Sequence, residues 1–160
     1  MTPPARLSIV DFDDAHAEAF YAINAEWIAE RFVLEPHDLY VLRNPRAAIL
    51  DPGGMIRVAA LDDRVVGTCA LILTAPGAYE LTKMGVSASV RGQKVGEALL
   101  YHMIDAARSL PIERLYLLTN HQQQAAIHLY EKLGWVRDPV VMRDFGATYA
   151  RADVAMSFPL

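Results

Sequence analysis

The sequence predicts an α/β protein, in which helices and strands form packed layers. The spacing of apolar residues changes repeatedly along the chain between the period of two that is typical of strands and the period of about 3.6 that is typical of helices. No repeat and no low-complexity segment interrupts this alternation. With 160 residues, of which 53% are hydrophobic and 21% charged, the chain can form one domain, residues 1–160, with a continuous core.

Two helices are expected in the N-terminal third. From Ala15 to Arg31, apolar residues recur at helical spacing and define one face that we expect to be buried: Phe20, Ile23 and Trp27. A shorter helix is expected near His37–Leu42. It should stop at Asn44-Pro45, because the residue before a proline resists helical geometry.

Four further segments of the first half read as strands: Arg6–Val10, Met55–Leu61, Val65–Leu73 and Tyr79–Val86. The acidic turn at Asp62-Asp63 separates the second from the third, so we expect these two to form an antiparallel hairpin. Pro76 and Gly77 then break the chain before the fourth.

Composition and charge argue against several classes of function. Fifteen Lys and Arg against nineteen Asp and Glu give a formal net charge of -4, so no global positive field exists to attract nucleic acid. The longest apolar runs are strand-sized, well short of the roughly 20 residues that cross a bilayer. The N-terminus has no basic and apolar secretory signal. We therefore expect a cytoplasmic protein that binds neither nucleic acid nor a membrane.

A metal or disulfide site is not expected either. The single cysteine, Cys69, allows no internal disulfide and no multi-cysteine zinc site. His102, His121 and His128 share no ligand spacing with acidic or sulfur partners.

The segment Val90–Leu100 is the first with a chemical signature. It follows a predicted strand and opens a predicted helix. The first N–H groups of a helix lack internal partners and carry the positive end of its dipole, so they can bind a phosphate. Gly92 and Gly96 would let a pyrophosphate approach the backbone closely. On this segment alone, an ordinary turn followed by tight helix packing is an equal alternative.

Arg91-Gly92-Gln93-Lys94-Val95-Gly96 resembles the coenzyme-binding motif of the GNAT superfamily of N-acetyltransferases: Gln or Arg, two residues, Gly, one residue, then Gly or Ala. Lys94 departs from this motif, because it stands where the family commonly has its middle glycine. Its amide N–H remains available, and its ammonium could attract phosphate. The resemblance implies that acetyl-coenzyme A is bound by a run of residues: Arg91, Gly92, Gln93, Lys94, Val95, Gly96 and Glu97.

Glu80–Val86 resembles the family's fourth strand, whose backbone pairs with the pantetheine arm of the coenzyme in the manner of an added strand. Met84 and Val86 are the positions that the resemblance assigns to this contact. The alternative is that both side chains fill the core, as apolar residues that alternate in a strand normally do.

The C-terminal third carries the more specific part of the resemblance. Arg114–Leu118 is a predicted strand, and a helix is expected to end at Leu133-Gly134, where glycine suits a left-handed cap. Thr119-Asn120 and Ala126–Trp135 resemble the family's second signature, and Arg151–Phe158 resembles its last strand.

In all, the resemblance covers about Val65–Leu160. It implies a central, mostly antiparallel, splayed mixed sheet of about six or seven strands with about four flanking helices.

The same resemblance implies transfer of an acetyl group to a primary amine by direct attack in a ternary complex. This reaction needs a neutral amine, a polarised carbonyl and a proton for the departing thiolate. Tyr130 matches the family's tyrosine near the coenzyme sulfur and is the expected proton donor, since a phenol with a pKa of about 10 is protonated at neutral pH. Its alternative is a buried aromatic residue. Glu80 is the expected base, with a solvent-facing strand glutamate as the equal alternative.

Three further positions have two interpretations each. By its family position, Asn120 holds a pantetheine amide, or it caps the following helix. Glu35 and Asp38 could recognise a cationic acceptor, but we favour helix-start carboxylates. A mechanism in which Cys69 takes the acetyl group first is disfavoured, because the thiol lies in an apolar run without a cationic neighbour.

The expected partner is a small-molecule or peptide amine, and the apolar content permits a homodimer. A non-catalytic acyl-coenzyme A binder or sensor would share the fold and the pyrophosphate loop, but it would need no acid or base. Tyr130 and Glu80 favour catalysis over this alternative.

Overall fold

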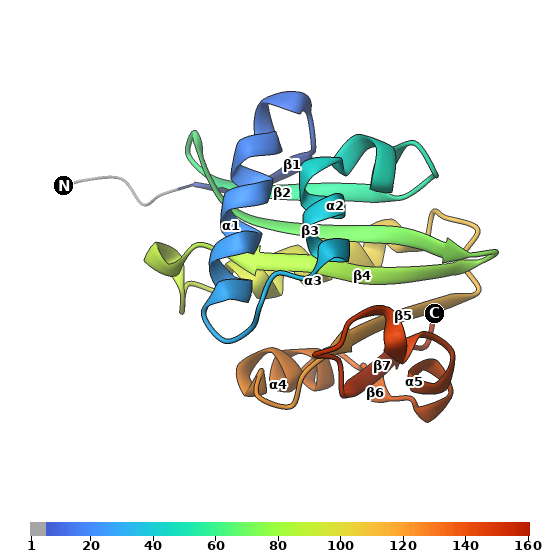
Figure 1. Ribbon diagram of the computed structural model, residues 1–160. Helices are drawn as coiled ribbons and strands as arrows, with labels where there is room; N and C mark the ends of the chain where they lie inside the picture. Colours follow the sequence, from blue (N-terminus) through green and yellow to red (C-terminus); the bar gives the residue numbers. More distant parts are fainter. Residues whose placement is uncertain (1–5) are drawn as a thin grey trace.

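A seven-stranded mixed sheet forms the centre of the computed structural model, which describes residues 6–160 (Figure 1). The strands are β1 (Leu7–Asp11), β2 (Met55–Leu61), β3 (Arg64–Ala75), β4 (Ala78–Val86), β5 (Arg114–Thr119), β6 (Val136–Arg137) and β7 (Val154–Phe158). Their spatial order is β1-β2-β3-β4-β5-β7-β6. Among these strands β4 and β5 run parallel, and every other neighbouring pair is antiparallel. The predicted mostly antiparallel, mixed sheet is confirmed.

Five α-helices within residues 6–160 flank the sheet: α1 (Ala17–Ala29), α2 (Pro36–Arg43), α3 (Val95–Ala107), α4 (Gln124–Lys132) and α5 (Pro139–Phe145). Figure 1 shows α1 and α2 in front of β2–β4 and α3 behind them. The largest apolar cluster joins α3 and α4 to one face of the sheet. Two smaller clusters lie under α1 and α2 and under α5 on the opposite face.

The sequence missed one helix and one strand, α5 and the two-residue β6. Asp138 caps α5 by accepting hydrogen bonds from the N–H groups of Val140 and Val141, and Pro139 occupies its first turn. These start signals are recognisable in the sequence. At seven residues, however, the helix is too short to show a clear apolar period.

The buried face of α1 differs from the prediction. Phe20 is fully buried as expected, but the other buried positions are Asn24 and Ile28, whereas Ile23 and Trp27 are only partly buried. The face is rotated because Asn24 is hydrogen-bonded inside the protein, so its polar group can be buried at little cost.

The region after α2 also differs. The helix ends at Arg43 as expected, but Pro45 starts a further helical turn of the π type at Arg46–Leu50. A proline is tolerated at the first position of a helix, because its missing N–H would have no partner there.

Strands β4 and β5 are paired over only part of their length. Their register joins Ala78–Leu81 to Arg114–Leu117. Beyond Leu81, β4 continues for five residues without a partner on β5. The divergence of these two strands opens the sheet at its centre, which confirms the splayed sheet. The candidate site lies at this opening.

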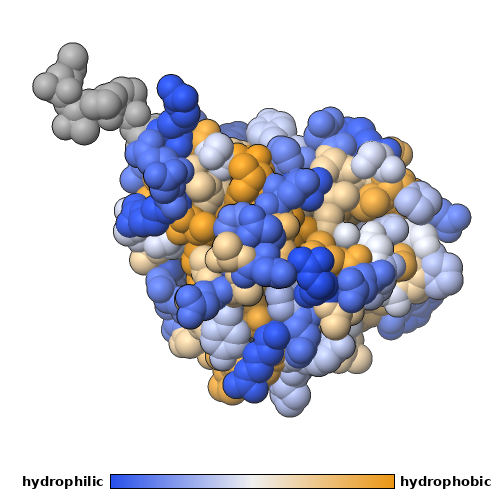
Figure 2. Space-filling view, turned by 90° about the horizontal axis from the view of Figure 1, so that it is seen from above, coloured by the Kyte–Doolittle hydropathy of each residue, from blue (hydrophilic) through white to orange (hydrophobic). Residues whose placement is uncertain are grey.

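In the described chain, residues 6–160, no helix is long and apolar enough to cross a bilayer. Figure 2 shows apolar residues in separate groups among polar ones on the face that it views.

Candidate active site

Two connected cavities lie where β4 and β5 diverge. The inner cavity has a volume of about 50 Å³, which is room for a group of a few heavy atoms. The outer groove is larger, about 450 Å³. Five residues line both: Trp27, Met84, Thr119, Gln123 and Tyr130. A long ligand in the groove could therefore place a small terminal group in the inner cavity.

The groove contains several residues that the sequence assigned to the coenzyme. Met84, Val86, Arg91 and Gly96 line it. Gly96 lies in the first turn of α3, where an added methyl group would meet side-chain carbons no closer than 3.6 Å. Gly92, just before this helix, has a φ of +84° that favours glycine.

Lys94 caps α3 in the left-handed conformation, with a φ of +62°. This geometry explains why glycine suits its position in the motif, since a side chain is disfavoured there. Gln93 and Lys94 are exposed, whereas Val95 is buried in the core. The loop therefore lies at the surface, and its one buried side chain, Val95, anchors the start of the helix.

Two charged residues of the motif are paired with neighbouring elements. The Arg91 guanidinium donates to Glu30, beyond the end of α1. The Lys132 ammonium on α4 donates to Glu97 at 2.7 Å. The side chain of Glu97 thus joins α3 to α4.

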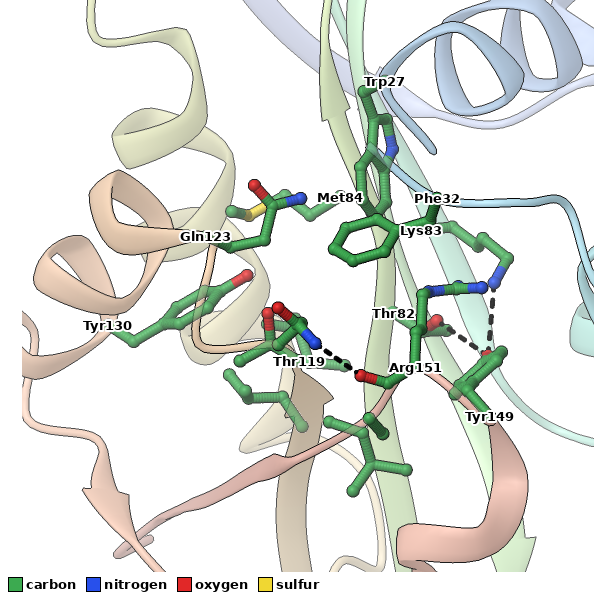
Figure 3. Close-up of a pocket in the computed structure, with 15 residues that line it drawn as sticks. Trp27, Phe32, Thr82, Lys83, Met84, Thr119, Gln123, Tyr130, Tyr149 and Arg151 are labelled. Atoms are coloured by element: carbon green, nitrogen blue, oxygen red, sulfur yellow. Dashed lines mark hydrogen bonds between the residues drawn. The ribbon is translucent and has the colours of Figure 1, made fainter. Parts of the chain in front are cut away.

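A buried charge cluster borders the inner cavity, and we define it as Glu35, Asp38, Lys83, Tyr149 and Arg151. Asp38 is completely buried. Its Oδ1 accepts from the Lys83 Nζ at 2.9 Å, and its two oxygens accept from the Arg151 guanidinium at 2.7 and 2.8 Å. The Lys83 ammonium also donates to the Tyr149 hydroxyl at 3.2 Å. Figure 3 shows Lys83, Arg151 and Tyr149 gathered on one side of the cavity.

The charges in this cluster change each other's pKa. Burial alone would raise the pKa of Asp38, but its bonds to Arg151 and Lys83 hold the pKa well below the usual range. Burial lowers the pKa of Lys83, and Asp38 opposes that shift. Asp38 is therefore a carboxylate at neutral pH, as its bidentate bond to Arg151 requires.

Glu35 and Asp38 occupy the start of α2, as the favoured interpretation of these carboxylates expects. Glu35 precedes the helix, and the Asp38 Oδ2 accepts from the Glu35 N–H at 2.9 Å. The Glu35 carboxylate accepts from the N–H of Ala150 at 2.9 Å and from Arg151. Both carboxylates are thus occupied by protein donors, and the cationic side chains Lys83 and Arg151 line the cavity.

Glu80 is buried and does not face solvent, with 2% of its surface exposed. Burial raises its pKa to about 7, although Lys83 and Arg151 act against the shift. The side chain is not among those that line the inner cavity or the groove in residues 6–160. Its pKa suits proton transfer near neutral pH, but its side chain does not border the space in which a ligand would lie.

Tyr130 lies at the junction of the two cavities. Figure 3 shows its ring extending from α4 toward the space opposite Trp27, Phe32 and Arg151. It is 8% exposed, and its hydroxyl has no hydrogen-bond partner within residues 6–160. Burial raises its pKa far above the usual value, so the phenol is protonated at neutral pH.

Cys69 is completely buried, and burial raises its pKa to about 12. Because the thiolate is the nucleophilic form of cysteine, Cys69 is poorly suited to accept an acyl group. Residues 6–160 also contain no group of three or more His, Cys, Asp or Glu side chains placed to hold a metal ion.

Asn120 lines the inner cavity, and both ends of its amide are used inside the protein. Its Nδ2 donates to the carbonyl of Arg151 at 2.8 Å, and its Oδ1 accepts from the N–H of Gln122 at 2.8 Å. It closes the turn that precedes α4, whose N-cap is Gln123. The side chain therefore connects the end of β5 to the segment that carries Arg151.

Sequence reasoning missed Lys83, Tyr149 and Arg151. Lys83 lies within the segment that resembles the family's fourth strand, but its burial depends on an ion pair with Asp38, 45 residues away in the sequence. Arg151 was assigned to a strand that begins only at Val154. The sequence did contain a sign of the partner carboxylates, because the spacing of three between Glu35 and Asp38 at a helix start indicates a capping box. It gave no sign of the cations that bind them.

The comparisons with known proteins agree with this geometry. Residues 9–135 match the family described as the acetyltransferase (GNAT) family. A curated relative, an IAA acetyltransferase from Azospirillum brasilense, is 33% identical over 99 residues, which is 61% of this chain. The match spans 60% of that relative's length.

Solved structures share the fold over nearly the whole chain. An acetyltransferase of the GNAT family from Staphylococcus aureus MU50 has a TM-score of 0.85 at 20% identity, covering 96% of this chain and 98% of that one. A PaiA N-acetyltransferase from Thermoplasma acidophilum, solved in complex with coenzyme A, has a TM-score of 0.72 at 15% identity, covering 97% and 99%.

Proposed function

This chain belongs to the acetyltransferase (GNAT) family, and we propose that it transfers an acetyl group from acetyl-coenzyme A to a primary amine by direct attack in a ternary complex. One observation carries the proposal: Tyr130 presents a protonated phenol at the junction between a long groove and a small inner cavity. A leaving thiolate at that junction would have a proton donor beside it.

The coenzyme is proposed to lie in the outer groove. Its diphosphate would bind backbone N–H groups between Gly92 and Glu97, at the start of α3, where the helix dipole is positive. The N–H of Gln93 already donates to the carbonyl of Val90 at 3.2 Å, so the other amides of this segment would make the contact. Arg91 would exchange Glu30 for a phosphate. The pantetheine arm would follow β4 beyond Leu81, where this strand lacks a partner on β5, with Met84 and Val86 beside it and Asn120 near its end.

The chemical step follows from this placement. The amine nitrogen forms a bond to the acetyl carbon, and the bond between that carbon and sulfur breaks. The thiolate takes the proton of the Tyr130 hydroxyl, and the proton of the amine passes to Glu80. Because Glu80 does not line the cavities, this proton must travel through a water or another side chain.

The acetyl carbonyl also needs a hydrogen-bond donor as negative charge develops on its oxygen. Lys83 and Met84 line the inner cavity. Neither residue has a register partner on β3 or β5. We assign this role to the backbone at these two residues.

The acceptor is tested by a panel of amines, with free thiol release as the signal. The panel should contain amino acids, polyamines and peptides. The compound abbreviated IAA in the name of the relative, an IAA acetyltransferase, is added as a separate candidate acceptor. Calorimetry with coenzyme A and acetyl-coenzyme A provides the binding measurement. Binding together with transfer to at least one amine supports the proposal.

The two negative outcomes differ in meaning. Tight binding of acetyl-coenzyme A without transfer to any acceptor would favour the non-catalytic sensor. Absence of coenzyme binding would contradict both functions. Cys69→Ser serves as a control, since a direct attack predicts that this variant keeps its activity.

A further inference from the structure

Strand β4 has an unusual backbone conformation in the wall of the inner cavity. Lys83 has a φ of +52°, a left-handed conformation that is unfavourable for a residue with a side chain. The pairing with β3 shifts at this point, from Thr82 opposite Ala70 to Gly85 opposite Thr68. A conformation of this kind persists only where the surrounding structure holds it in place. We call this feature the Lys83 kink.

The backbone of the Lys83 kink is held by two completely buried polar side chains. The Thr68 hydroxyl donates to the carbonyl of Lys83 at 3.0 Å. The Asn24 Nδ2 donates to the same hydroxyl oxygen at 2.9 Å and to the carbonyl of Phe20 at 2.8 Å. Both Asn24 and Thr68 have 0% of their surface exposed. Helix α1 is thereby connected through β3 to the kink in β4.

The same chain of hydrogen bonds extends to the cavity wall on the α1 side. The Trp27 Nε1 donates to the Asn24 Oδ1 at 2.8 Å, and Trp27 lines both cavities. Its ring packs against Gly85 so closely that an added methyl group there would lie 2.5 Å from a ring carbon. Trp27 and the kink are therefore fixed relative to each other.

The side chain of Lys83 anchors the other end of the kink. Its ammonium donates to Asp38 and to the Tyr149 hydroxyl. The residue is thus held at its carbonyl by Thr68 and at its ammonium by the charge cluster. Two independent anchors leave the backbone of Lys83 and Met84 little freedom to rotate.

We infer that Asn24 and Thr68 are positioning residues for acetyl transfer: by holding the Lys83 carbonyl they fix the unpaired backbone that faces the inner cavity. The inference rests on the proposed function. Neither side chain lines the cavities, so both act through Lys83. A displacement of reacting groups by about 1 Å can lower a rate by about 100-fold, which is the scale of effect that such an anchor can have.

Thr68→Val tests the inference, because it keeps the shape of the side chain and removes the hydroxyl. We expect kcat for acetyl transfer to fall by about 10-fold to 100-fold, while the Kd of coenzyme A changes less than about threefold. Thr68→Ser restores the hydroxyl and should return kcat to near the unaltered value. A threonine with only a packing role would not give this division between kcat and Kd.

Thr74, which is exposed whereas Thr68 is buried, provides a control for the loss of a hydrogen bond between β3 and β4. Like Thr68, this residue is on β3, and its hydroxyl donates to a carbonyl on β4, that of Ala78, at 3.3 Å. The same hydroxyl accepts a hydrogen bond from the Tyr116 hydroxyl at 2.9 Å. It lines neither cavity. Thr74→Val should therefore lose a bond of the same kind and keep kcat. Equal losses of kcat in Thr68→Val and Thr74→Val would overturn the inference.

Two further measurements keep the test decisive. Should Thr68→Val fail to fold, Asn24→Ser removes the support of the Thr68 hydroxyl and should lower kcat severalfold with an unchanged Kd of coenzyme A. Should the unaltered protein transfer no acetyl group at all, the proposed function fails, and the inference is tested by binding alone. The preference for acetyl-coenzyme A over coenzyme A should then be lost in Thr68→Val and kept in Thr74→Val, and any other result would overturn it.

Discussion

Two lysines in the left-handed conformation lie at opposite ends of the candidate site. Lys83 has a φ of +52° in the wall of the inner cavity, and Lys94 has a φ of +62° at the start of α3. Lys83 is 3% exposed and bonded at both its carbonyl and its ammonium, whereas Lys94 is exposed. At the inner end the side chain holds the backbone in place. At the proposed coenzyme end the backbone of Lys94 caps α3, and its side chain makes no cap hydrogen bond to the helix.

Replacing Lys83 by glycine gives the largest expected change. Glycine removes the left-handed strain but leaves Asp38 without one of its buried partners, and breaking a buried ion pair costs about 3 to 5 kcal/mol. We therefore expect Lys83→Gly to lower the free energy of unfolding by about 3 kcal/mol in a denaturant titration. An unchanged or higher free energy of unfolding would mean that the bond between Lys83 and Asp38 makes no net contribution to stability.

Tyr130 lies between the two ends and should affect the reaction without affecting stability to the same degree. Loss of a general acid lowers a rate by about 100-fold or more, so Tyr130→Phe should reduce kcat on this scale. The Kd of coenzyme A, measured by calorimetry, should stay nearly constant. An unchanged kcat would remove Tyr130 from the mechanism.

Glu80 links the inner end to pH. Burial raises the carboxyl pKa from its usual 4.5 to about 7 in the folded protein, so folding favours the protonated form. The stability contributed by this protonation is full below pH 4.5 and is lost as the pH rises through about 7. Glu80→Gln should therefore gain stability relative to the unaltered protein as the pH rises from 4 to 8, by up to about 3 kcal/mol at roughly 1.4 kcal/mol per pKa unit.

The same substitution has a separate effect on the rate. A base with a pKa of about 7 makes kcat rise with pH through that value, and Glu80→Gln should lose this acidic limb. A pH–rate profile that keeps the limb in the variant would place the base elsewhere, whatever the result for stability.

Lys94→Gly is expected to have the smallest effect and the opposite sign to Lys83→Gly. Glycine adopts the left-handed conformation without strain, and no buried partner is lost, so the free energy of unfolding should rise by roughly 0.5 to 1 kcal/mol. Lys94→Ala keeps the strain and serves as the control. Coenzyme affinity should persist in Lys94→Gly, because the amide N–H is unchanged. A lower free energy of unfolding in Lys94→Gly would show that the Lys94 side chain, like that of Lys83, contributes to stability.

Most of the sheet was predictable because its signals are local. Met55–Leu61 matches the predicted strand at both ends, and the turn residue Asp62, with a φ of +55°, follows from its acidic turn sequence. The apolar spacing of α1 gave a helix with the wrong buried face. A hydrophobic pattern cannot show that a polar residue such as Asn24 will find partners on β3.

The candidate site divides in the same way. The proposed diphosphate site around Gly92–Gly96 would use backbone groups of one continuous segment, so a motif can indicate it. The inner end joins Asp38, Lys83 and Arg151 from three separate parts of the chain. No spacing in the sequence indicates that these three residues meet. The favoured interpretation of Glu35 and Asp38, carboxylates at a helix start, follows from local sequence, but their bonds to Arg151 do not.

The bond between Arg151 and Asp38 spans 113 residues and has a consequence for the order of folding. A contact between residues this far apart closes a long loop, and the entropy lost in that closure opposes formation of the contact. The loop before α3 uses one continuous segment and has no such cost. We therefore expect the wall of the inner cavity to form later in folding than the start of α3.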